Sequence, residues 1–152
     1  MMQLFDEVGE AVRSLAPDGI GQLNIRPRAY GIKIWTGPEK ERREHYEAQV
    51  IGPGDVPDAE ILAIEVGFHA EHPDPAANDA AMAPLGRRER TWRKALGGEP
   101  VLGAFLGRAE HWRRLSETWA DPDLGDPDLG VELASRLLDY LGALEPLRSP
   151  SS

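Results

Sequence analysis

The chain has 152 residues, of which 41% are hydrophobic and 28% charged, and its formal net charge at pH 7 is −9. This composition is typical of a globular domain and excludes a disordered or collagen-like chain. The acidic charge makes a nucleic-acid partner or a membrane partner unexpected, and no apolar run approaches the roughly 20 residues of a membrane helix. The chain has no cysteine, and Asp6, Glu7 and Glu10 interrupt the start where a secretory signal would be apolar. We therefore expect a cytoplasmic protein.

Residues 2–15 predict an amphipathic helix, because apolar residues recur there at spacings of three and four. Four segments with a period of two follow between residues 22 and 69, joined by loops rich in glycine and proline. In the clearest of them, one face carries Leu62, Ile64, Val66 and Phe68. These segments predict an antiparallel meander with one buried face.

Helical spacing returns after residue 75. It predicts one helix from Asn78 or Asp79 to Leu96, a second over residues 100–119, and a third that ends near Leu144. A tandem repeat of Asp-Pro-Asp-Leu-Gly, at residues 121–125 and 126–130, precedes the third helix. The fold class is thus predicted as α+β, a four-stranded antiparallel meander with an N-terminal helix and three C-terminal helices packed on one face (order αββββααα). Residues 1–147 form a single domain in this interpretation, and residues 148–152 form a disordered tail.

Strand alternation collects polar side chains on the other face of the predicted sheet. Its members are Arg26, Lys33, Trp35, His45, Glu47, Gln49, Glu65 and His69. The loop around Val56 is nearly symmetric, which predicts a register with Glu47 opposite Glu65 and His45 opposite Gly67. Two facing carboxylates repel by about 0.2–1 kcal/mol, so Lys33 or a cation is expected between them.

Gly31 and Gly67 fall inside strands on this polar face. A glycine there marks either a bulge or the close approach of another backbone or ligand. A bulge at residue 67 would move His69 to the other face, so the two interpretations place that histidine differently.

Two functions are compatible with this polar face. The first is a small acidic, non-catalytic binding or regulatory protein that holds a protein partner, preferably a basic one, or a small ligand. Its binding residues would be Arg26, Lys33, Trp35, His45, Glu47, Glu65 and His69, and neither a cofactor nor a metal ion is expected. No oligomeric state follows from the pattern.

The alternative is a small metal-assisted hydrolase or nuclease. Glu47 and Glu65 would then be metal ligands, His69 a ligand or base, and Lys33 the cation beside the developing anion. A plain solvent surface with weak ion pairs would show the same residues.

The segment 87–94 mixes arginines with Trp92, as nucleic-acid surfaces do. A single basic helix in an acidic chain more often pairs with acidic neighbours, here the Asp-rich repeat. That repeat lacks the ligand order of an EF-hand calcium loop. The excess of arginine over lysine is typical of a GC-rich bacterial coding bias.

Overall fold

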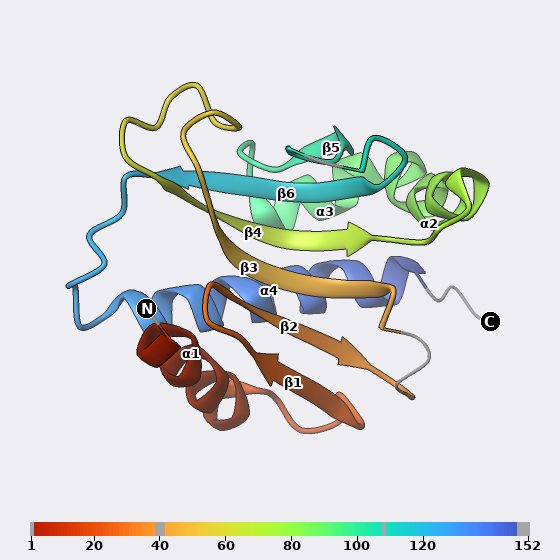
Figure 1. Cartoon of the computed structure of the whole chain (residues 1–152). Helices are drawn as coiled ribbons and strands as arrows, with labels where there is room; N and C mark the ends of the chain where they lie inside the picture. The colour runs from red at the N-terminus through yellow and green to blue at the C-terminus, as the bar shows by residue number, and fades with distance from the viewer. Residues whose placement is uncertain (1, 39–41, 108, 149–152) are drawn as a thin grey trace.

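The structure is a computed structural model that describes residues 2–38, 42–107 and 109–148. Within these residues the elements are, in chain order, α1 (Met2–Leu15), β1 (Leu23–Pro27), β2 (Gly31–Thr36), β3 (Glu44–Ile51), β4 (Ala63–Ala70), α2 (Pro75–Arg87), α3 (Glu89–Leu96), β5 (Val101–Ala104), β6 (Arg113–Ala120) and α4 (Leu129–Arg148). The strands form one sheet in the order β1-β2-β3-β4-β6-β5, with every neighbouring pair antiparallel (Figure 1).

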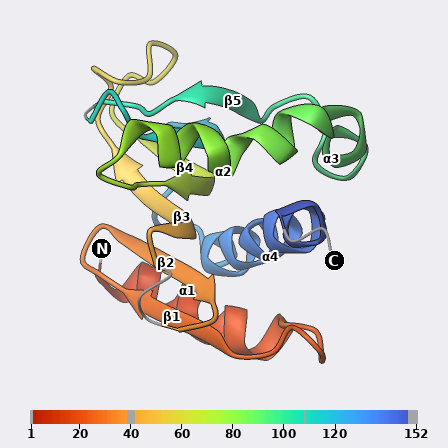
Figure 2. The same ribbon diagram turned by 90° about the vertical axis from the view of Figure 1, so that its right-hand side faces the viewer.

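The hydrophobic core lies between this sheet and the helices, which share one of its faces. The long helix α4 passes behind the centre of the sheet in Figure 1, and Figure 2 shows it beside β3 and β4 from another side. The sheet contributes its even-numbered residues to the core, Ile32, Ile34, Tyr46, Ala48, Ile64, Val66 and Phe68, together with Leu115 of β6. Phe5 and Val8 of α1 and Leu133 and Leu137 of α4 are buried against them.

The first half of the fold confirms the prediction. The helix α1 has the predicted bounds, β1 to β4 form the predicted meander, and the even-numbered residues of β2, β3 and β4 face the core. The last predicted helix corresponds to α4, which extends to Arg148. Residues 149–152 of the predicted tail, and Glu39 and Lys40 in the loop after the second of the four predicted segments, lie outside the described residues.

The second half corrects the prediction, because the sheet has six strands rather than four and the element order is αββββααββα. The segment expected to be a helix over residues 100–119 is the hairpin of β5 and β6. Leu115 and Trp119 of β6 pack on the core, but Glu117 lies between them on the same face, ion-paired to Arg136. Because of this buried polar residue, the sequence of β6 does not show the apolar alternation with a period of two that indicates a strand.

The predicted helix ending at Leu96 is divided at Arg88 into α2 and α3. It begins earlier than expected, because the carboxylate of Asp74 accepts a hydrogen bond from Ala76 N at 3.0 Å and caps α2. Asn78 instead binds the backbone of His72 and His111. The end at Gly97 confirms the prediction.

The insertion of β6 between β4 and β5 determines the environment of the polar face. Because β4 has β3 on one side and β6 on the other, all eight of its residues are buried, including Glu65 and His69. Phe105, just after β5, packs its ring on His69 with centroids 4.7 Å apart. The interpretation of this face as a plain solvent surface is therefore wrong for its buried residues, which include His45, Glu47, Glu65 and His69.

The loop before β4 is anchored by Asp121, the first residue of the Asp-rich repeat. Its carboxylate accepts hydrogen bonds from the backbone N–H groups of Glu60, Ile61 and Leu62 at 2.8, 2.7 and 3.2 Å. Among the described residues, the helices lack the combination of length and apolar character that crossing a bilayer requires.

Candidate functional site

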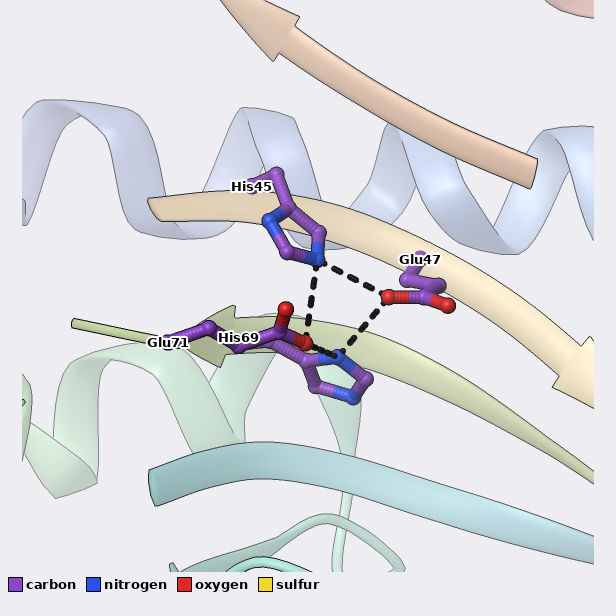
Figure 3. A group of neighbouring side chains, drawn as sticks. All are labelled: His45, Glu47, His69 and Glu71. Atoms are coloured by element: carbon purple, nitrogen blue, oxygen red, sulfur yellow. Dashed lines mark hydrogen bonds and ion pairs between the residues drawn. The ribbon is translucent and has the colours of Figure 1, made fainter. Parts of the chain in front are cut away.

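Two copies of the sequence His-x-Glu lie side by side on the polar face of β3 and β4. His45 and Glu47 form the first copy, His69 and Glu71 the second. The register places His45 directly opposite His69. Glu71 follows the end of β4, where its backbone N–H still binds the carbonyl of Arg43. Because the strands are antiparallel, the two glutamates approach the histidine pair from opposite directions, and all four side chains converge (Figure 3).

The converging atoms are one nitrogen or oxygen from each side chain. Nε2 of His45 is 2.8 Å from Oε1 of Glu47 and 3.4 Å from Oε2 of Glu71. Nδ1 of His69 is 3.1 Å from each of the same two oxygens. Together these four atoms lie within 4.8 Å of one another. We call His45, Glu47, His69 and Glu71 the His-Glu cluster.

The remaining ring nitrogen of each histidine is held by an acceptor outside the cluster. Nδ1 of His45 donates to the carbonyl oxygen of Arg42 at 2.7 Å. Nε2 of His69 donates to Oε2 of Glu65 at 2.8 Å. Because a carbonyl and a carboxylate can only accept, these nitrogens carry the protons, and the ring orientation is fixed.

Glu65 is itself fully engaged behind His69. Gln49 donates to one of its oxygens at 2.8 Å, and the hydroxyl of Ser116 donates to the other at 2.6 Å. Arg114 in turn donates to Ser116 Oγ at 2.9 Å. Glu65 therefore supports His69 and does not face the centre of the cluster.

The cluster is fully buried on its histidine side and slightly exposed on its carboxylate side. The side chains of both histidines are 0% exposed, whereas those of Glu47 and Glu71 are 6% and 10% exposed. Lys33 lies at the carboxylate side, with Nζ 3.4 Å from Oε1 of Glu71. In such a partly desolvated setting, charges interact much more strongly than at the surface.

The pKa values show how strongly the cluster favours a positive charge at its centre. Burial would raise the pKa of Glu47, but hydrogen bonds from His45 and His69 outweigh it and lower this pKa to about 2. The same two histidines lower the pKa of Glu71 well below its ordinary value, against the effect of burial. Burial would lower the pKa of His69, but Glu65, Glu47 and Glu71 raise it well above its usual range. Two imidazole nitrogens and two carboxylate oxygens are also a ligand set for a divalent transition metal.

The structure brings together only some of the residues predicted for the site. His45, Glu47 and His69 belong to the cluster, Glu65 lies behind His69, and Lys33 lies beside Glu71. Trp35 and Arg26 lie apart from it, with the Arg26 guanidinium over the Trp35 ring at 5.2 Å. The basic segment 87–94 is also elsewhere, where Arg93 pairs with Glu89 and stacks on Trp92.

The predicted strand register is wrong by two residues. Glu47 faces Gly67 rather than Glu65, Gln49 faces Glu65, and His45 faces His69. The loop is centred one residue later than Val56, which shifts every pair but keeps each side chain on its predicted face. Glu47 and Glu65 are consequently separated by His69, which contacts both.

Glu71 is the cluster residue that the sequence reasoning missed. Two signals could have identified it: the alternation from Glu65 through His69 continues to residue 71, and His69-x-Glu71 repeats the His45-x-Glu47 sequence. Comparisons of the chain with protein-family models, with curated proteins and with solved structures find no match.

Proposed function

We propose that the protein binds one divalent transition-metal ion, of the zinc type, in the His-Glu cluster. The observation that carries the proposal is the orientation of the two imidazoles. Each has its outer nitrogen bound to an acceptor, so that the inner nitrogen points at the same two carboxylate oxygens. Metal-binding histidines characteristically have this outer partner, a carboxylate or a backbone carbonyl.

The distances are close to those of a metal centre. Bonds of about 2.1 Å in a tetrahedral site separate neighbouring ligand atoms by about 3.4 Å. The four nitrogen–oxygen pairs measured here span 2.8–3.4 Å, and all four atoms lie within 4.8 Å of one another, so the side chains would have to rearrange to place every pair near the tetrahedral spacing around the ion. Imidazole ligands favour Zn²⁺, Co²⁺ or Fe²⁺ over Mg²⁺.

This proposal departs from the expectation of a protein without a cofactor and is nearer to the metal-assisted alternative. Its ligands differ from those of the alternative, since His45 and Glu71 replace Glu65. The function as a non-catalytic protein-binding module remains a prediction. Burial of His45, Glu65 and His69 leaves those three side chains without surface to offer a protein partner, which favours the metal-ion proposal.

The proposal is tested by thermal unfolding of metal-free protein with and without Zn²⁺, Co²⁺ and Mg²⁺. An ion that binds only the folded state stabilises it by about 2.7 kcal/mol at a hundredfold excess over Kd. We expect a rise in Tm with Zn²⁺ and Co²⁺ and little change with Mg²⁺. Calorimetric titration should give one ion per chain.

Two ligand variants and one matched control make the test specific. Glu47→Gln and Glu71→Gln keep the shape of the side chain but remove an anionic ligand, and each should weaken Zn²⁺ binding by roughly 100-fold or more. Glu44→Gln is the control, because Glu44 is on the same strand but points away, paired with Arg148 and His72. Unchanged Zn²⁺ affinity in both ligand variants, or no binding by the wild type, would contradict the proposal.

A further inference from the structure

A pocket of about 310 Å³ opens beside Glu47, on the carboxylate side of the His-Glu cluster. Its lining combines the turn between β1 and β2 with one edge of β3: Arg28, Ala29, Tyr30, Gly31, Glu47, Gln49 and Val50. Its volume is at the lower end of the range for small-molecule sites, about 300–1,000 Å³. Both histidines are fully buried, so the pocket contacts the cluster through Glu47, whose side chain is 6% exposed.

Gly31, in the lining of this pocket, lets β2 lie close to β3. It faces Gln49 across β2 and β3, on the same face of the sheet as Glu47. A Cβ atom at residue 31 would lie 3.0 Å from the carbonyl oxygen of Ala48 and 3.1 Å from Cβ of Gln49. The walls are fixed by backbone hydrogen bonds from Arg28 N to Gly31 O at 2.7 Å and from Val50 N to Tyr30 O at 2.9 Å.

The pocket lining carries one positive and one negative side chain, Arg28 and Glu47, in a chain with a net charge of −9. Lys33 lies two residues beyond Gly31 on the same face, opposite Glu47, but outside the lining, and its ammonium group pairs with Glu71. A divalent ion in the cluster would add positive charge on the far side of Glu47. The ion would neutralise Glu47, so that Arg28 would set the charge of the lining and attract an anion.

On this basis we infer that the pocket binds a small anionic molecule carrying a carboxylate or phosphate group, held by Arg28 beside Glu47 of the metal site. The inference rests on the proposed metal site and names the class of small molecule that binds beside it. A guanidinium fits both anions through paired hydrogen bonds. The Tyr30 side chain, 66% exposed at the rim, supplies an apolar surface for the rest of the molecule.

The experiment uses the Co²⁺-loaded protein, whose visible absorption reports changes around the ion. Inorganic phosphate and acetate are the anionic probes, and acetamide is the neutral counterpart of acetate. We expect saturable spectral changes with phosphate or acetate and none with acetamide. The anion that binds more tightly identifies the ligand as a phosphate or a carboxylate compound.

Variants of the protein test whether Arg28 is responsible for anion binding. Arg28→Gln should weaken anion binding at least tenfold and leave Co²⁺ affinity unchanged, and Arg28→Lys should restore part of the loss. Arg13→Gln, on the exposed side of α1, is the matched control and should bind the anion as the wild type does. Failure to take up Co²⁺ overturns the proposed function and this inference with it. Uptake of Co²⁺ without a saturable anion response, or with equal responses in Arg28→Gln and Arg13→Gln, overturns the inference alone.

Discussion

Glu65 is the residue whose role changes most between sequence and structure. The sequence alone suggests a metal ligand, whereas the structure places Glu65 behind His69, saturated by donors from Gln49, Ser116 and His69. Burial would raise its pKa, but the charge and hydrogen bond of His69 and the bonds from Ser116 and Gln49 lower it. Glu65 therefore remains ionised and fixes the proton of His69 on Nε2, which leaves Nδ1 for the cluster.

This role makes a prediction for Glu65→Gln. The substituted amide keeps the size of the side chain but no longer supplies the anion that orients His69. Loss of such an outer partner typically weakens metal binding by about 10–100-fold. We expect Zn²⁺ titration to show a loss in this range, smaller than that of Glu47→Gln. A loss larger than that of Glu47→Gln would instead identify Glu65 as a direct ligand.

At the scale of elements, the contact between β4 and β6 depends on Gly67. The sheet pairs continuously through this residue, so the interpretation as a bulge is wrong and that of close approach is confirmed. A Cβ atom at residue 67 would lie 2.4 Å from the carbonyl oxygen of Leu115 and 2.5 Å from Cα of Ser116. Both are backbone atoms, so the strands themselves would have to move.

We therefore predict that Gly67→Ala lowers the free energy of unfolding by about 1–3 kcal/mol or more, the usual cost of overpacking. Displacement of Ser116 should also disturb Glu65 and weaken Zn²⁺ binding. Gly103→Ala is the control, because Gly103 lies in β5 with no atom within 4 Å of the added Cβ. Urea denaturation of both variants measures the difference, and equal stabilities would show that β6 does not depend on the glycine.

Regular elements could be predicted from the sequence, but their partners could not. The helix α1 and strands β1 to β4 have a clean periodicity, which also places His45, Glu47 and His69 on one face. The strand β6 could not be recognised, because Glu117 interrupts its apolar face, where hydrogen bonds from Arg136, Tyr140 and Trp119 stabilise it. Without β6 the burial of Glu65 and His69 could not be anticipated, since an edge strand would have left them exposed.

At the scale of the whole molecule, the cluster should couple stability to pH. The pKa of His69 is raised in the folded state. Its contribution to the free energy of unfolding is therefore complete below its pKa in the unfolded chain, about 6.5, and is lost as pH rises. The pKa of Glu47 is lowered to about 2. Its contribution to the free energy of unfolding is therefore present above about pH 4.5 and is lost as pH falls towards 2. The contribution of these two groups in the metal-free protein is thus greatest between about pH 4.5 and 6.5.

Above this pH range, stabilisation of the protein by a bound metal ion should increase with pH. A metal ion must displace the proton on Nδ1 of His69, so Zn²⁺ affinity should rise with pH, by up to tenfold per pH unit while His69 is protonated. Urea denaturation at pH 5.5 and 8 should show lower stability at pH 8 without the ion and a larger stabilisation by Zn²⁺ at pH 8 than at pH 5.5. Affinity independent of pH would place the ion away from His69.

The pairing of His45 with His69 also bears on how the chain folds. Slipping β3 against β4 by two residues keeps every side chain on its own face, so hydrophobic burial alone discriminates weakly between the two alignments. Only the native alignment sets the two His-x-Glu sequences against each other. An ion that needs both copies would bind only correctly aligned chains and would shift the equilibrium from misaligned chains towards the native alignment. The supply of metal ions during synthesis would then govern the yield of native protein.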